Sequence, residues 1–232
     1  MDAETFPVAH PDRPQAACAL LLDTSRSMRG EKIRGLEAGV KAYREYLHKD
    51  PMAKDIVETA VITFSTEANV AHTFSNVETM PEIELKAQGW TAMGAAIDKA
   101  IELIEERKQY YKAEGVDYYR PFLVLITDGG PTDIKGKEKL AEYAKKIQDG
   151  AKGKKFYPLF FGTKNADFDK LKQLVGEAGA VVGIDEVRFE DLFQWLSRSV
   201  SGLKDSQPGD QVQLEDPTKL TVENPNPFAF EV

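Results

Sequence analysis

The sequence predicts an α/β protein with a doubly wound, mostly parallel sheet of six strands and helices on both faces. Two observations predict this fold class. Continuous apolar runs, such as residues 16–23 ("AACALLLD"), are typical of strands that are buried on both faces of a sheet. These runs alternate along the chain with segments whose apolar residues recur every three or four positions, as in amphipathic helices. One pair of runs is joined by a short turn, so we expect one antiparallel edge strand.

The first half of the predicted domain contains a strand, a hairpin and two long helices. After the strand at 16–23, the segment 31–47 has the apolar spacing of an amphipathic helix. Two runs rich in β-branched and aromatic residues, within 58–75, predict a hairpin that turns at residues 66–69. The second long helix is expected over 93–113.

The second half supplies the other three strands. The run "RPFLVLITDGGPTD" predicts a strand that reaches Asp128. In the next predicted strand, residues 155–162, Pro158 favours an edge or irregular strand, because proline cannot donate a hydrogen bond to a neighbouring strand. The remaining predicted elements are a basic helix at 137–150, a short helix at 168–176, a short strand at 180–184 and a last helix near 190–203.

The two ends of the chain differ in composition from the domain at 15–203. Residues 1–14 contain three prolines and predict a flexible arm. Residues 204–232 are acidic and contain four prolines, which predicts a tail without a core of its own. One hypothesis is that the acidic residues of this tail, or the terminal carboxylate of Val232 beside Glu231, bind a metal ion of the same or a neighbouring molecule.

Composition narrows the functional class. The net charge of −8 argues against a nucleic-acid partner, because binding to phosphates needs clustered Lys and Arg. The single cysteine, Cys18, cannot form an internal disulfide, and its place in an apolar run predicts a buried side chain. No apolar run approaches the roughly 20 residues that span a bilayer, and the first residues do not have the pattern of a secretory signal. We therefore expect a cytoplasmic protein without membrane or nucleic-acid partners.

Polar side chains with oxygen atoms follow the predicted strand ends. Asp23 and Asp128 each end an apolar strand, Ser25 and Ser27 follow the first of them, and Thr91 precedes a predicted helix. Carboxyl ends of parallel strands share one edge of a sheet, where ligands of such folds bind. Carboxylates and hydroxyls without thiol or imidazole suit Mg²⁺, with Mn²⁺ or Ca²⁺ as alternatives. The sequence therefore predicts a metal site formed by these five residues.

Simpler interpretations stay open for parts of this pattern. Asp23, Ser25 and Ser27 alone would also suit the cap of the following helix, and "DGGPTD" would suit a plain turn. Asp133 is expected to cap the next helix or to accept a hydrogen bond behind the metal ligands, with direct ligation of the ion as a lesser alternative. We predict an exposed rim that binds a partner, formed by Met28, Arg29, Trp90, Gly129 and Asp133.

At these residues the sequence resembles the von Willebrand factor A (VWA) family. Asp-x-Ser-x-Ser at 23–27, Thr91 and "TDG" at 127–129 match the family's metal-ion-dependent adhesion site (MIDAS), and the resemblance covers roughly residues 15–203. The segments "GWTAMGAAI", "LITDGGPTD" and "LFQWLSRSVS" resemble the bacterial, tellurium-resistance-associated (TerY-like) branch. The resemblance implies that the serines and the threonine ligate the ion directly or nearly so, and that the aspartates often act through water.

The expected function is a protein-binding module rather than an enzyme. The ion would receive an Asp or Glu carboxylate from a protein partner, and the rim would supply specificity. The resemblance implies a bacterial stress-response complex linked to tellurite resistance or phage defence, with a kinase or phosphatase as possible partners. The alternative is a metal-dependent hydrolase or phosphatase that uses the same ion to activate water. The lack of a free general base beside the predicted ligands argues against this alternative.

Overall fold

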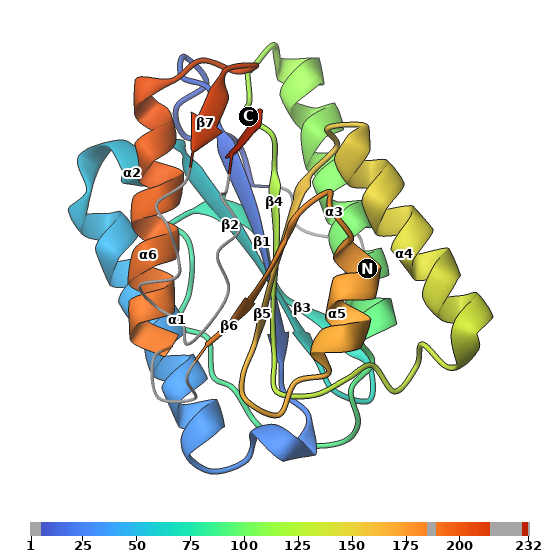
Figure 1. The fold of residues 1–232 in the computed structure, drawn as a ribbon. Coiled ribbons are helices and arrows are strands. Elements are labelled where there is room, and N and C mark those ends of the chain that lie inside the picture. Colours follow the sequence, from blue (N-terminus) through green and yellow to red (C-terminus); the bar gives the residue numbers. More distant parts are fainter. Residues whose placement is uncertain (1–5, 185–188, 214–228, 232) are drawn as a thin grey trace.

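The computed structural model describes residues 6–184, 189–213 and 229–231. Its centre is a six-stranded sheet in the order β3-β2-β1-β4-β5-β6, in which only the β2–β3 pair is antiparallel (Figure 1). The predicted fold class is confirmed. The strands are β1 (Ala16–Asp23), β2 (Val57–Phe64), β3 (Ala68–Asn76), β4 (Phe122–Thr127), β5 (Tyr157–Gly162) and β6 (Ala180–Gly183).

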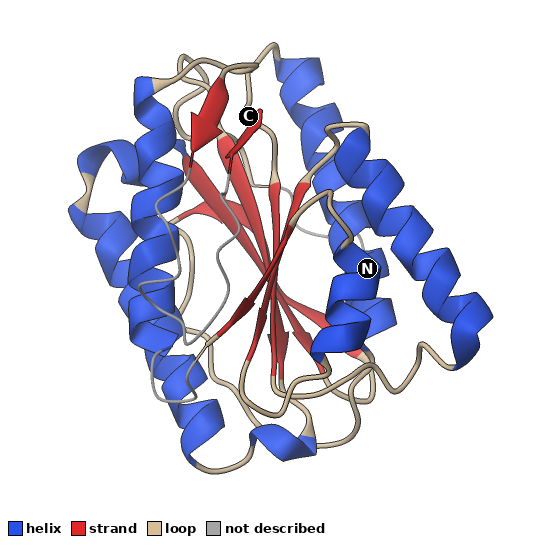
Figure 2. Ribbon diagram, in the orientation of Figure 1, coloured by secondary structure: helices blue, strands red, loops and turns tan. Residues whose placement is uncertain are grey.

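Helices cover both faces of the sheet (Figure 2). One layer contains α1 (Glu31–Lys49), α2 (Pro51–Ile56) and α6 (Phe189–Ser201). The opposite layer contains α3 (Met93–Glu114), α4 (Gly136–Lys152) and α5 (Phe168–Val175). Two short 3₁₀ turns, η1 (Arg26–Met28) and η2 (Gly202–Asp205), precede α1 and follow α6. None of the helices among the described residues combines the length and apolar character that crossing a bilayer requires.

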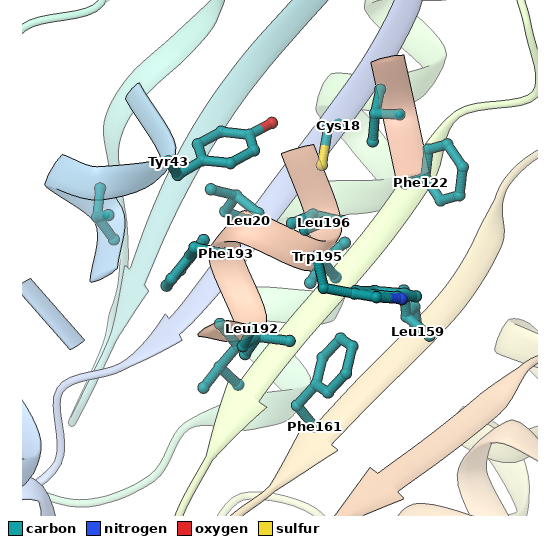
Figure 3. Close-up of a cluster of buried hydrophobic side chains, with 14 of the residues drawn as sticks. Cys18, Leu20, Tyr43, Phe122, Leu159, Phe161, Leu192, Phe193, Trp195 and Leu196 are labelled. Carbon is teal, nitrogen blue, oxygen red and sulfur yellow. The ribbon is translucent and has the colours of Figure 1, made fainter. Parts of the chain in front are cut away.

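The core between the sheet and α6 is built from large, fully buried side chains (Figure 3). The rings of Trp195 and Phe161 meet edge to face with centroids 5.8 Å apart, which adds to the gain from burying their apolar surface. A Cβ atom on Gly39 would lie 2.6 Å from the ring of Phe193, so glycine lets α1 and α6 approach closely. Cys18 is buried as predicted, and burial raises the pKa of its thiol to about 12.

Of the two alternatives that Pro158 predicts, an edge strand or an irregular one, the edge strand is wrong. β5 lies between β4 and β6, and β6 is the edge strand. Pro158 pairs with Leu123 of β4, whereas the pairing between β5 and β6 begins one residue later, at Leu159 and Ala180. The proline therefore lies just before the first paired residues of β5 and β6, where the β6 ladder does not call for its N–H.

The described part of the predicted arm lies against the domain. The Nη1 of Arg107 donates to the carbonyl oxygen of Phe6 at 2.7 Å, and the Phe6 ring lies 5.6 Å from that of His72. Arg13 pairs with Asp55 of α2 at 2.8 Å. These contacts fix residues 6–14 beside α2, α3 and the edge strand β3.

Two short strands follow η2. β7 (Gln211–Gln213) pairs antiparallel with β8 (Ala229–Glu231), and Figure 1 places both at the end of the sheet opposite to η1. The Tyr119 hydroxyl, just before β4, donates to the Ser206 carbonyl at 2.9 Å, which agrees with this placement. The hypothesis that tail carboxylates reach the metal site concerns the side chains of the tail's acidic residues and the terminal carboxylate of Val232, and these lie outside what the structure describes for the last strand and the residues around it.

Candidate metal centre

Asp23 is the anchor of the loop that follows β1. Its side chain is fully buried, and one carboxylate oxygen accepts a hydrogen bond from the backbone N–H of Ser25 at 2.8 Å. The other oxygen accepts from the hydroxyl of Thr127, the last residue of β4, at 2.6 Å. The carboxylate therefore joins the ends of two neighbouring strands and sets the direction of the Ser25–Ser27 turn.

A chain of short hydrogen bonds connects Asp128 to the two serines. The Ser27 hydroxyl donates to Oδ1 of Asp128 at 2.6 Å, and the Oγ atoms of Ser25 and Ser27 lie 2.9 Å apart. Ser25 and Asp128 are buried, whereas Ser27 is exposed. Because β1 and β4 are adjacent and parallel, residues 101 positions apart in the sequence meet at one edge of the sheet.

Thr91 reaches the same edge through the long loop between β3 and α3. Hydrogen bonds hold this loop to the β1 turn, from the Gln88 N–H to the Thr24 carbonyl at 2.8 Å and from the Arg26 N–H to the Gly89 carbonyl at 3.3 Å. Behind the threonine, the Ala92 N–H donates to the Ser65 carbonyl at 2.7 Å. Thr91 itself is mostly buried.

Both serines and Thr91 line the same pocket, which has a volume of about 420 Å³. Its lining is formed by Ser25, Arg26, Ser27, Gly89, Trp90 and Thr91. The structure thus brings all five predicted metal ligands together: Asp23 bonds to Ser25, Asp128 bonds to Ser27, and Thr91 shares the pocket with both serines.

The electrostatics of the site reflect two carboxylates in a confined space. Burial raises the pKa of Asp23 to about 6, and the nearby charge of Asp128 adds to this rise. Hydrogen bonds from Ser25 and Thr127 act in the opposite direction. A positive charge is already close, since the Nζ of Lys32 lies 2.9 Å from Oδ2 of Asp128.

The donor set fits a hard divalent cation. Two carboxylates and three hydroxyls lie close together at this edge, and a divalent ion would offset the buried negative charge of Asp23 and its smaller repulsion by Asp128. No group of three or more His, Cys, Asp or Glu side chains suited to a metal occurs in the described part of the chain. The candidate centre is instead a cluster of hydroxyls and two carboxylates, all of which offer oxygen ligands.

Of the predicted rim residues, Trp90 lines the pocket, and Arg29 and Gly129 belong to the loops that follow β1 and β4. Trp90 is 70% exposed, which is unusual for a large apolar side chain. Arg29 is exposed, and its Nε donates to the Ala87 carbonyl at 3.4 Å. Gly129 is half-buried, and its N–H donates to the Thr127 hydroxyl at 3.1 Å.

The rim prediction for Met28 and the helix cap predicted for Asp133 need correction. Met28 is fully buried in the core cluster on the α1 side of the sheet, because the η1 turn points it inward while Ser27 faces outward. Asp133 caps a helix, but the preceding one: its two oxygens accept from the N–H groups of Gly94 and Ala95, at 3.1 and 3.0 Å, at the start of α3. The loop after β4 folds back over that helix, so the cap comes from a distant part of the chain.

Two cationic residues at the site were not predicted from the sequence. Arg26 stands between the two serines of the motif, is exposed and lines the pocket. Lys32 lies in the first turn of α1 and contacts Asp128. A lysine in a helical first turn opposes the helix dipole, and this is the signal that could have identified Lys32.

Fold and site together define an α/β domain with a candidate cation site at the carboxyl edge of its sheet. The chain belongs to the von Willebrand factor type A domain family, whose profile matches residues 18–195. No curated protein sequence matches the chain.

Solved structures share the fold at low sequence identity. A von Willebrand factor type A protein from Catenulispora acidiphila has a TM-score of 0.62 at 18% identity, over 82% of this chain and 43% of that one. The pilus adhesin SpaC from Lactobacillus rhamnosus GG, in its open conformation, has a TM-score of 0.63 at 12% identity, over 82% and 30%. Proximal thread matrix protein 1 from the mussel byssus, with a zinc-occupied MIDAS motif, has a TM-score of 0.54 at 17% identity, over 82% and 48%. The chain spans less than half the length of each.

Proposed function

We propose that this chain is a metal-dependent protein-binding module. Ser25, Ser27 and Thr91 would hold a divalent ion, with Asp128 and Asp23 supplying the negative charge beside them. The observation that carries the proposal is the hydrogen-bonded group of Ser25, Ser27 and Asp128, which opens into the same pocket as Thr91. The bound ion would offer a coordination position to an Asp or Glu carboxylate of a partner protein.

The donors support a hard divalent ion at this site. Oxygen ligands favour Mg²⁺, with Mn²⁺ and Ca²⁺ as alternatives. The zinc-occupied MIDAS motif of the mussel protein supports the presence of a divalent ion at this place in the fold. We assign Mg²⁺ because the carboxylates and hydroxyls in this chain are hard ligands and no imidazole or thiol lines the pocket among the described residues.

The walls of the pocket suit an acidic partner segment. Arg26 and the exposed Trp90 both line it, and among the described residues no acidic side chain pairs with Arg26. A guanidinium attracts a carboxylate, and the indole offers a flat apolar surface to a neighbouring side chain. Arg29 adds a second exposed cation nearby. This local positive charge contrasts with the overall charge of −8.

The alternative is a metal-dependent hydrolase or phosphatase. It would need a general base or a nucleophile beside the ion. Among the described residues, the pocket lining contains no carboxylate and no imidazole, and Asp23 is already bonded through both oxygens. These features favour a binding role over catalysis. Turnover of phosphate esters with Mg²⁺ or Mn²⁺, abolished by Asp128→Asn, would favour the alternative.

The cellular setting is inferred from the sequence. The segments that resemble the tellurium-resistance-associated branch support a role in a bacterial stress-response complex for tellurite resistance or phage defence. Within such a cytoplasmic complex, a kinase or a phosphatase is a suitable candidate for the protein partner. The adhesin and thread-matrix proteins that share the fold support a binding role in general.

Partner capture from cell extract tests this proposal. Immobilised protein should retain a partner in the presence of Mg²⁺ and release it when EDTA is added. Ser25→Ala should lose the partner, because it removes a ligand without changing the fold. Thr79→Ala serves as a matched control, since this exposed residue follows β3 at the opposite end of the sheet. Retention that is equal with and without EDTA, and equal in Ser25→Ala, would contradict the proposal.

A further inference from the structure

Lys32 contacts the candidate metal centre from α1. Its Nζ lies 2.9 Å from Oδ2 of Asp128, and the lysine side chain is 17% exposed while the aspartate side chain is fully buried. The first turn of a helix is an unfavourable place for a positive charge, because the helix dipole is positive at this end. An ion pair with a buried carboxylate gives the lysine a role that its helix alone does not explain.

Lys32 contacts the carboxylate oxygen of Asp128 that is not bonded to Ser27. Oδ1 of Asp128 accepts from Ser27 at 2.6 Å, and Oδ2 faces the ammonium group. The two aspartates and the lysine together carry a formal charge of −1, compared with −2 for the aspartates alone. With Lys32 present, a divalent ion that binds at this site is attracted by less net negative charge, and the nearby ammonium group also repels it.

We propose that Lys32 is a built-in competing cation that sets the ion affinity of this site. This inference rests on the proposed function. The ammonium compensates Asp128 when no ion is present and opposes a divalent ion when one binds. Two consequences follow from Coulomb's law: the ion-free protein is more stable than it would be with the lysine neutralised, and its ion affinity is lower.

The test compares Lys32→Gln with the wild-type chain by isothermal titration with MgCl₂ and with MnCl₂. The glutamine keeps much of the length and hydrogen-bonding capacity of the side chain but removes its charge. We expect the variant to bind both ions about tenfold more tightly at low ionic strength, because a unit charge near a divalent ion is removed. Lys32→Arg, which keeps the charge, should stay within about threefold of wild type.

Thermal unfolding gives an independent readout. Without a divalent ion, Lys32→Gln should unfold at a lower temperature than wild type, and Mg²⁺ should raise its unfolding temperature by more than it raises that of wild type. Lys145→Gln is the matched control, because Lys145 pairs with Asp149 on the exposed surface of α4 and should change neither quantity. If Lys32→Gln folds only when Mg²⁺ is present, the proposal is supported in its strongest form.

The outcomes separate this inference from the proposed function. If wild type binds Mg²⁺ or Mn²⁺ but Lys32→Gln binds them with equal or lower affinity, the role of Lys32 is refuted and the metal site stands. If wild type binds neither ion, the proposed function fails, and the role of Lys32 fails with it. A gain in affinity that Lys32→Arg shares would also overturn the inference, because the charge would then not be its cause.

Discussion

Single residues fix the geometry of the candidate metal centre. Gly89 has a φ angle of 69°, in the left-handed region that favours glycine, and a Cβ atom there would lie 2.2 Å from the Thr66 hydroxyl. This glycine directly precedes Trp90 and Thr91, so its backbone conformation determines where the indole of Trp90 and the hydroxyl of Thr91 lie. Two features therefore favour glycine at position 89: the left-handed backbone conformation and the closeness of Thr66.

Gly89→Ala should therefore lower both stability and ion affinity. The backbone strain alone costs about 1–3 kcal/mol, and the contact with Thr66 adds to it. Urea unfolding measures the first effect, and Mg²⁺ titration measures the second. Gly115→Ala isolates the backbone contribution, because Gly115 has a φ angle of 68° but a Cβ atom there would meet no other atom within 4 Å. Equal losses of stability in the two variants would show that the contact with Thr66 contributes nothing.

At the scale of elements, the start of α3 depends on a residue from another loop. The residue before α3, Ala92, makes no side-chain cap, and Asp133 provides the cap instead. The same loop is joined to Thr91 by two hydrogen bonds with Thr132, one from each backbone N–H. The cap thus supports the start of α3, directly after the loop that carries Thr91.

Asp133→Ala should destabilise the protein by about 0.5–2 kcal/mol, the usual cost of losing a helix cap. Thermal or urea unfolding measures this loss. Asp133→Asn should recover much of it, because an amide oxygen can still accept one of the two hydrogen bonds. Partner capture should be reduced less by Asp133→Ala than by Ser25→Ala. An unchanged unfolding midpoint in Asp133→Ala would contradict the capping role.

Sequence patterns identify the long elements of this fold but not its short turns and loop paths. Apolar runs and helical spacing identified all six strands of the sheet and five of its helices, because the core requires these patterns. The short helix α2 was missed, although Asp50 accepts from two N–H groups of its first turn and Pro51 opens it, a recognisable start signal. Met28 and Asp133 were misplaced because the direction of a short turn and the path of a loop depend on tertiary contacts.

On the scale of the whole molecule, the topology brings the site together. β1 and β4 are neighbours in the centre of the sheet, and the loops after β1, β3 and β4 meet at its carboxyl edge. The sequence could predict this meeting because strand-end carboxylates in parallel strands share an edge. The cations of Arg26 and Lys32 belong to no spacing pattern, and the one sequence signal for either is the place of Lys32 in the first turn of a helix.

The metal site itself is tested most directly by the anomalous diffraction of a crystal soaked in MnCl₂. We expect one strong manganese peak bounded by the oxygen atoms of Ser25, Ser27 and Thr91, with Asp128 beside it. The peak should disappear in a crystal of Ser25→Ala soaked in the same way. A crystal of the wild-type chain with no manganese at this edge of the sheet, or with its peak elsewhere, would contradict the assignment of these residues as metal ligands.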